Sequence, residues 1–176
     1  MFNTTIATQI YAKICFEATN SQKKIIENLS EYLSDDDFSR IFVLNGFAGT
    51  GKTTLIAALV AALKELRIKP VLLAPTGRAA KVLARYCGEQ ALTIHKRIYR
   101  QRTNADYESK FSLDFNREQG AVFIVDEASM LSDSTGDGAL FGSGSLLEDL
   151  VSYVRSGRGC RLILVGDSAQ LPPVGC

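Results

Sequence analysis

The segment Gly46–Thr54, GFAGTGKTT, constrains the fold of this 176-residue chain more than any other. It follows the apolar run Ile41–Leu44 and precedes the Ala/Leu-rich stretch Thr53–Leu66, which we expect to form a strand and a helix. A strand, a G-x-x-x-x-G-K-[ST] loop and a helix in this order form a phosphate-binding P-loop. The sequence therefore predicts that the chain binds a nucleoside triphosphate together with Mg²⁺.

Each residue type in the loop suits contact with phosphate. Glycines allow backbone N–H groups to approach phosphate oxygens closely, and the helix N-terminus adds a partial positive charge. Lys52 is expected to reach the terminal phosphates during catalysis, and the Thr53 hydroxyl to bind Mg²⁺. The residues expected to hold the nucleotide are Gly46, Ala48, Gly49, Thr50, Gly51, Lys52, Thr53 and Thr54.

Two acidic residues follow the apolar run Val122–Val125. A buried parallel strand delivers such residues to its carboxyl end, where ligands bind in α/β sheets. Asp126 is expected to be a magnesium ligand, and Glu127 to accept a proton from the attacking water, which is a hydrolase arrangement. The alternative, two solvated acids after a strand, leaves the upstream P-loop without its expected acidic partner.

Four apolar runs are continuous rather than alternating, as in parallel strands buried on both faces: 41–44, 71–74, 122–125 and 162–165. Helical stretches are expected at 21–33, after Thr19 or Asn20 as cap, at 53–66 and at 77–87. Strands alternating with helices predict an α/β sandwich with a parallel sheet. A capping box at Ser145–Glu148 opens a further helix to about Ser156, after a Gly/Ser-rich loop over 132–145.

The net charge of +1 conceals a basic central third. Residues 64–117 carry 12 basic and 5 acidic groups, a balance of +7, whereas residues 118–176 carry 3 basic and 8 acidic groups. This distribution fits one surface that meets a polyanion and another that holds metal-binding carboxylates, although a solvated charged face is the alternative. Without a run of 18 apolar residues or a signal pattern, we expect a cytoplasmic protein with no membrane partner. The four scattered cysteines favour reduced thiols over a metal site or disulfides.

Five segments in order resemble the first motor domain of superfamily 1 DNA helicases of the RecD/Dda branch. They are 46–54, Ala74–Ala80 (APTGRAA), Thr93–His95 (TIH), Asp126–Ser129 (DEAS) and Gly166–Gly175 (GDSAQLPPVG). The resemblance covers nearly the whole chain, from residue 22 to residue 175. It implies a RecA-like P-loop NTPase that uses ATP and Mg²⁺ and moves on single-stranded DNA.

The resemblance also implies individual roles. Gln22 matches the Q motif that recognises adenine, with an exposed glutamine at a helix start as the alternative. Gln170 is placed to sense the γ-phosphate, although Asp and Gln after a strand are usually turn formers. Pro75, Thr76 and Arg78 match the first strand-contacting motif, and Thr93 and His95 the next. The alternative to strand contact for His95 is a structural role.

Residues 97–119 are polar with interspersed aromatics, and Phe111–Phe115 alternates as an exposed strand does. We expect a small β-hairpin insertion there, where this branch often carries a hairpin used in strand separation. Its residues Arg97, Tyr99, Arg100 and Arg102 suit stacking and phosphate contact. A hairpin that only covers the sheet is the favoured interpretation.

Helicases of this branch have a second motor domain, whose arginines complete the ATP site. Because the sequence stops at Cys176, we expect one RecA-like domain over 1–176, with N-terminal helices within 1–38. We expect a monomeric fragment of a larger helicase that binds ATP and Mg²⁺ but hydrolyses slowly, since a missing arginine finger costs about 10³–10⁵ in rate. The competing functions are an ATP-gated nucleic-acid-binding module and a small P-loop kinase, although a kinase does not explain Asp126, Glu127 and Gln170 together.

Overall fold

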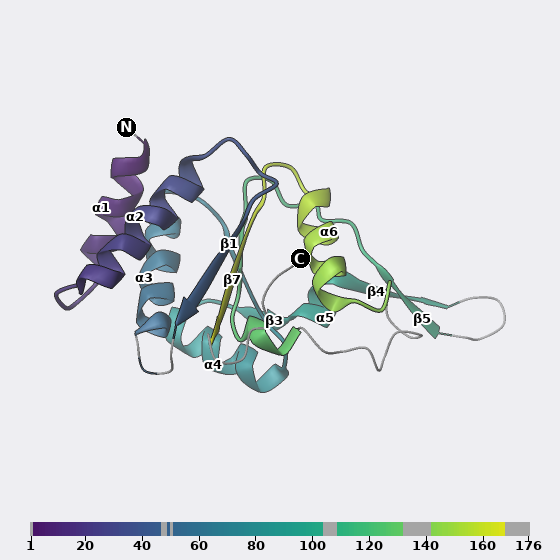
Figure 1. Ribbon diagram of the computed structural model, residues 1–176. Coiled ribbons are helices and arrows are strands. Elements are labelled where there is room, and N and C mark those ends of the chain that lie inside the picture. Colours follow the sequence, from purple (N-terminus) through teal and green to yellow (C-terminus); the bar gives the residue numbers. More distant parts are fainter. Residues whose placement is uncertain (1, 47–48, 50, 104–108, 132–141, 168–176) are drawn as a thin grey trace, which may run out of the picture.

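A five-stranded parallel sheet forms the centre of the molecule (Figure 1). The computed structural model describes residues 2–46, 49, 51–103, 109–131 and 142–167. Within them the strand order is β1-β7-β6-β2-β3. The strands are β1 (Ile41–Gly46), β2 (Pro70–Ala74), β3 (Ala91–Thr93), β6 (Val122–Val125) and β7 (Arg161–Asp167). The predicted α/β fold with a parallel sheet is confirmed, and the short strand β3 is an addition to the four expected strands.

The continuous apolar runs reflect burial on both faces of the sheet. Along β6, Ile124 packs in one hydrophobic cluster and Phe123 in the other, and Ile163 and Leu162 of β7 divide in the same way. Successive side chains of a strand point to opposite faces, so both faces need apolar residues. This is why these strands lack the polar alternation of a half-exposed sheet.

Helices cover both faces (Figure 1). Residues of α1 (Phe2–Lys13), α2 (Asn20–Ser34), α3 (Lys52–Glu65) and α4 (Gly77–Cys87) contribute to the first cluster. Residues of α5 (Ile94–Ile98), η1 (Ala128–Leu131) and α6 (Leu146–Ser156) contribute to the second. Helix α1, whose Ile6 and Ile10 are fully buried, joins α2 within the N-terminal region where helices were expected.

The hairpin expected within 97–119 is present. Strands β4 (Tyr99–Thr103) and β5 (Ser109–Leu113) pair antiparallel and form a separate two-stranded sheet. The hydroxyl of the buried Tyr99 donates to Asp149 Oδ2 of α6 at 2.6 Å, which attaches the hairpin base to the domain. Strand β5 ends at Leu113, before the Phe115 at which the alternating pattern stops.

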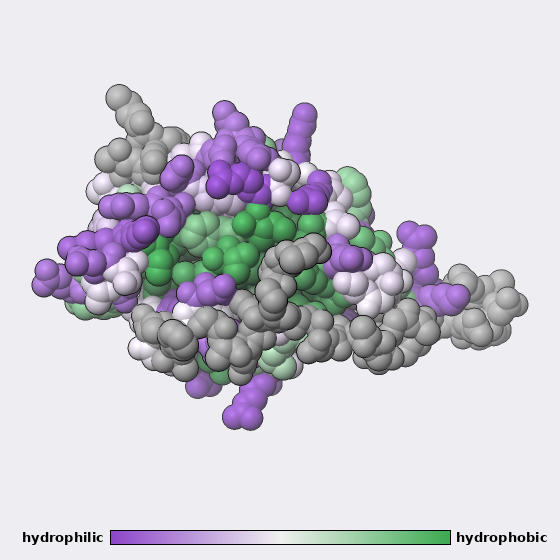
Figure 2. Space-filling view, viewed as in Figure 1, coloured by the Kyte–Doolittle hydropathy of each residue, from purple (hydrophilic) through white to green (hydrophobic). Residues whose placement is uncertain are grey.

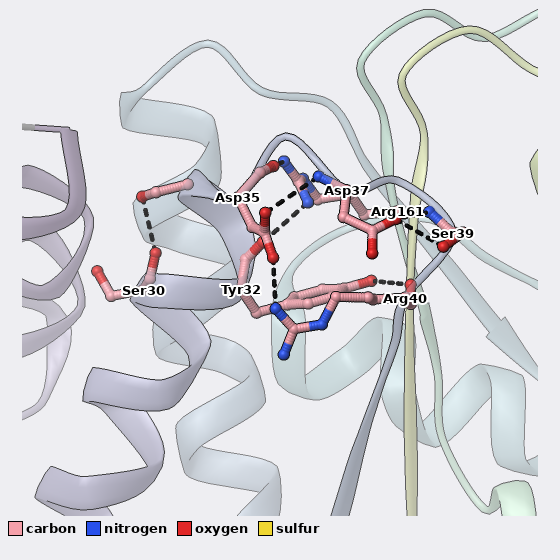
Figure 3. Close-up of polar contacts among 8 residues, drawn as sticks. Ser30, Tyr32, Asp35, Asp37, Ser39, Arg40 and Arg161 are labelled. Carbon is pink, nitrogen blue, oxygen red and sulfur yellow. Dashed lines mark hydrogen bonds and ion pairs between the residues drawn. The ribbon is translucent and has the colours of Figure 1, made fainter.

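A polar clamp at the amino ends of the strands joins α2 to β1 and β7 (Figure 3). The Tyr32 hydroxyl accepts from Leu162 N–H at 3.1 Å and can donate to Arg40 O at 3.1 Å or to Leu162 O at 2.9 Å. The guanidinium of Arg161, a residue only 8% exposed, donates to Tyr32 O at 2.8 Å and to Asp35 O. It also lies over the Tyr32 ring, 5.5 Å from its centroid. The clamp therefore fixes the end of α2 against the sheet.

An apolar area lies over β1 and β7, between α2 and α6 (Figure 2). Val43 of the edge strand β1 is 42% exposed, and Ile41, Leu164 and Val151 are only partly buried against the second cluster. Helix α6 thus covers this end of the sheet incompletely within the described part of the chain.

Candidate functional site

The carboxyl ends of β1, β6 and β7 lie side by side at one edge of the sheet. In the parallel register Gly46 lies beside Asp167, and Val125 beside Leu164. A cavity of about 680 Å³ opens at this edge. Its lining includes Gly49, Gly51, Lys52, Thr53 and Thr54 from the P-loop, and Asp126, Glu127, Gly166 and Asp167 from the other two strands. The structure therefore brings most of the predicted nucleotide and magnesium residues to one place.

Lys52 is held by the backbone of two strands. Its Nζ donates to Gly46 O at 2.5 Å and to Gly166 O at 3.3 Å, and it forms an ion pair with Asp167. The ammonium group is therefore oriented toward the cavity by β1 and β7 together. Asp167 is not among the residues expected to hold the nucleotide or the metal. Its position two residues after the apolar run 162–165, within the segment GDSAQLPPVG, is the sequence signal that identifies it.

The P-loop glycines adopt a backbone conformation that other residues rarely take. Gly49 has φ +81° and Gly51 has φ +80°, both in the left-handed region. Gly51 is also the N-cap of α3, and no side chain caps this helix. The N-cap residue thus offers no side-chain acceptor to the first N–H groups of α3, which suits phosphate binding at a helix N-terminus.

The two acids after β6 occupy a tight turn. Glu127 has φ +52°, a left-handed conformation that is uncommon for a residue with a side chain, and its N–H donates to Asp126 Oδ1 at 2.9 Å. Burial raises the pKa of Asp126, against the opposing effects of this hydrogen bond and of the Lys52 charge. Glu127 is exposed in the cavity, so both carboxylates are available to a ligand there.

A second cavity, of about 900 Å³, adjoins the P-loop on the α2 side. It shares Gly49, Gly51, Lys52 and Thr54 with the first, and Phe16 and Gln22 line its far part. Gln22 combines both interpretations of its role: its Oε1 accepts from Thr19 N–H at 3.0 Å in the capping box of α2, while it also lines the cavity beside the P-loop.

Phe16 was missed by the sequence analysis. It lies between α1 and α2, is 44% exposed and lines the cavity with Gln22. An exposed aromatic side chain beside a phosphate-binding loop is suited to stack on a nucleobase. The available signal was a phenylalanine six residues before Gln22 in an otherwise polar segment.

The expected DNA-contacting residues lie at the carboxyl ends of β2 and β3, outside both cavities. Thr76 and Thr93 cap α4 and α5, since their hydroxyls accept from Ala79 N–H and Lys96 N–H at 3.2 Å. Arg78 is exposed next to the half-buried Pro75. The His95 ring lies 5.6 Å from the Tyr99 ring, between centroids. Ala48, Thr50 and Gln170 lie outside the described residues.

The comparisons with known proteins agree with this geometry. A family model described as an AAA domain matches residues 17–176. The chain belongs to this family. It is similar to an ATP-dependent RecD2 DNA helicase of Deinococcus radiodurans, with 30% identity over 154 residues, which cover 88% of the chain and 19% of the relative. The resemblance to motor domains of RecD/Dda-like superfamily 1 helicases is thus confirmed.

Two further relatives belong to the same branch. The RecD subunit of the Mycobacterium tuberculosis RecBCD enzyme is 35% identical over 158 residues, which cover 76% of the chain and 24% of the relative. The ATP-dependent DNA helicase dda of phage T4 is 34% identical over 136 residues, 74% of the chain and 28% of the relative. The chain therefore spans less than a third of the length of each of these relatives. Among the described residues, no helix is long and apolar enough to cross a membrane.

Proposed function

We propose that this chain is the ATP-binding motor domain of an ATP-dependent DNA helicase, in which hydrolysis of ATP drives movement along single-stranded DNA. One observation carries the proposal: a single cavity contains the P-loop lysine, the threonine that follows it and both acids after β6. Two of the relatives, the RecD2 and dda proteins, are named as ATP-dependent DNA helicases. The cavity supports the ATPase part of the proposal, and the relatives support the DNA part.

The residues present fit a magnesium ion. The Thr53 hydroxyl and the Asp126 carboxylate line the same cavity, and hard cations such as Mg²⁺ take oxygen ligands. When bound, Mg²⁺ neutralises charge on the phosphates. Lys52 adds a second positive charge, and the first N–H groups of α3, together with Gly46, Ala48, Gly49, Thr50, Gly51 and Thr54, cradle the phosphate oxygens.

Glu127 accepts the proton of the attacking water in this proposal. It adjoins Asp126, and its carboxylate is exposed in the cavity rather than tied to the protein by a described ion pair. A base so placed can bind a water beside the metal-held phosphate. Gln170 senses the γ-phosphate, as the family motif implies. Arginines of a second motor domain complete the site, so the domain alone, as a monomer, turns over slowly.

The second cavity holds the nucleobase of ATP. Gln22 directs its amide toward the P-loop, and Phe16 offers a stacking surface at the same cavity. Single-stranded DNA passes over the ends of β2 and β3, where it meets Pro75, Thr76 and Arg78 and then Thr93 and His95. In this part of the chain the charge balance is positive, which suits contact with phosphates.

Phosphate release from ATP by the full-length protein, measured with and without single-stranded DNA, tests the proposal. We expect release with water as the only acceptor, stimulated by DNA, and its loss in Lys52→Ala. Lys64→Ala, in the same helix but ion-paired with Glu89, is the control and should leave the rate unchanged. Phosphate transfer that requires another acceptor would instead indicate a kinase, and release indifferent to DNA would exclude the motor.

A further inference from the structure

A third cavity lies away from the P-loop and is lined by residues of α5, the hairpin base and α6. Figure 1 shows where these elements lie in the fold. Its volume is about 310 Å³, and it shares no lining residue with the two cavities at the nucleotide site. Four cations contribute to its lining, Lys96, Arg97, Arg100 and Arg117, together with the aromatic Phe115. This is a polar site of mixed cationic and aromatic character.

Two of the four cations already have carboxylate partners. Arg97 Nη2 donates to Glu118 Oε1 at 2.7 Å, and Arg100 Nε donates to Asp114 Oδ2 at 2.7 Å. Hydrogen bonding from Arg100 lowers the pKa of Asp114, so this carboxylate stays ionised in its pair. Both acids of the cavity lining are thus neutralised by the protein itself.

Lys96 and Arg117 supply the remaining charge. Both are exposed, and neither forms an ion pair within the parts of the chain that the structure describes. Their two positive charges are therefore available to an anionic ligand. A ligand with two neighbouring anionic groups would complement them.

Phe115 is held at the surface beside these charges. It is 62% exposed, although a phenylalanine is normally buried. The next residue, Asn116, is buried and fixes the backbone to α6: its N–H donates to Ser156 Oγ at 3.0 Å and its Nδ2 to Val154 O at 3.3 Å. The exposed ring is thus part of an anchored segment, which makes it a rigid stacking platform.

Helix α5 joins the cavity to two of the proposed strand contacts. Lys96 follows His95 directly in α5, and its N–H donates to the Thr93 hydroxyl. One short helix therefore connects two of the residues proposed to contact DNA with the cation of the cavity.

We infer that this cavity is a further binding site for single-stranded nucleic acid, in which a base stacks on Phe115 and Lys96 and Arg117 contact its phosphates. The inference rests on the proposed function. Cations that follow a backbone and an aromatic ring that stacks on bases are the two components of single-strand binding surfaces. An acidic peptide would use the cations but would leave the ring without a role.

This site differs from the one expected from the sequence. Of the four hairpin residues considered for strand contact, Arg97 and Arg100 are engaged in ion pairs and Tyr99 is buried against Asp149. These side chains build the hairpin base. The residues that face a ligand are instead the neighbours Lys96, Phe115 and Arg117.

Salt dependence tests the phosphate contacts. Binding of fluorescein-labelled oligothymidylate to the full chain is measured by anisotropy over a range of salt concentrations. Loss of two contacts to phosphates of single-stranded DNA makes the slope of log K, the association constant, against log salt concentration less negative by about 1.4. At 0.1 M salt the same loss weakens binding about 25-fold. We expect this for the double variant Lys96→Ala/Arg117→Ala. The control Lys23→Ala/Lys24→Ala removes the same charge from exposed positions on α2 and should change neither quantity by more than about twofold.

Substitution of the ring tests the stacking separately. Phe115→Ala should weaken oligothymidylate binding by about 5- to 150-fold, the range for one lost base stack, without changing the salt slope. Phe115→Trp should restore the affinity. Tyr11→Ala, which removes a partly exposed aromatic residue from α1, is the control. Unchanged binding of a fluorescent ATP analogue in each variant shows that the domain is folded.

The outcomes separate the two proposals. If Arg78→Ala weakens binding but neither Lys96→Ala/Arg117→Ala nor Phe115→Ala does, the inference is wrong and the proposed function stands. If the wild-type chain does not bind oligothymidylate, both the nucleic-acid partner and this site are refuted. If the double variant loses binding to polyglutamate and oligothymidylate equally while Phe115→Ala has no effect, the cavity is a general anion site and the inference also fails.

Discussion

Removal of the Tyr32 hydroxyl should destabilise the domain although it lies far from the nucleotide site. This hydroxyl bridges the two strands at their amino ends: it accepts from Leu162 N–H of β7 and lies within hydrogen-bonding distance of Arg40 O next to β1 (Figure 3). Tyr32→Phe retains the ring and its packing but leaves the Leu162 N–H buried without this acceptor. An unsatisfied buried group of this kind costs about 1–3 kcal/mol.

We therefore expect the free energy of unfolding to fall by about 2 kcal/mol. For a domain of this size that corresponds to a loss of about 4–8 °C in Tm. Urea unfolding followed by circular dichroism measures the effect, and the m-value should stay unchanged because the buried surface is the same. Tyr11→Phe, at a residue 38% exposed, is the control and should change stability by less than about 0.5 kcal/mol. Equal stability of the two variants would refute the assigned role of the Tyr32 hydroxyl.

Three further predictions follow from contacts of individual residues. Hydrogen bonding from Lys69, and then from Arg97, lowers the pKa of Glu118 in the folded state. The stability that its carboxylate contributes is therefore present above the unfolded-state pKa and is lost as pH falls through the folded-state pKa. In urea unfolding, Glu118→Gln should lower the free energy of unfolding by about 1–2 kcal/mol at pH 7 and by little at pH 3. Phe16→Ala should weaken ATP binding about 5- to 10-fold, measured by titration calorimetry, with little change in tripolyphosphate binding; equal losses for both ligands would argue against base stacking. Burial raises the pKa of Cys87 to about 11, so iodoacetamide at pH 8 should modify the exposed Cys15 before Cys87, as read by mass spectrometry, and equal rates at these two thiols would contradict this burial.

Much of the fold was predictable because its signals are local. Continuous apolar runs marked four strands, and Thr19 and Ser145 marked the starts of α2 and α6. Strand β3 has three residues and α5 has five, so neither is long enough to show a period. Their existence depends on tertiary packing: Ile94 and Ile98 are fully buried against the second cluster.

The candidate site likewise contains residues that a local sequence signal identifies and residues that only the fold brings together. A fixed spacing identified Lys52 and Thr53, and the end of an apolar run identified Asp126 and Glu127. Asp167 belongs to the segment GDSAQLPPVG but carried no expected role there, and Phe16 lies in no motif, because both act at the P-loop through elements that only the fold brings together. Charge and aromatic content suited Arg97 and Tyr99 to strand contact as well as to a hairpin that covers the sheet, which was the favoured interpretation. In the structure Arg97 pairs with Glu118 and Tyr99 is buried against Asp149.

The central claim is that the cavity at the carboxyl ends of β1, β6 and β7 hydrolyses ATP with Glu127 as the base. The most direct measurement compares wild type and Glu127→Gln of the full-length protein for both ATP affinity and DNA-stimulated phosphate release, with Glu148→Gln on α6 as the control. A lost general base predicts a fall in turnover of about 10²–10⁴-fold with ATP affinity retained within about twofold. Unchanged turnover in Glu127→Gln would contradict the account.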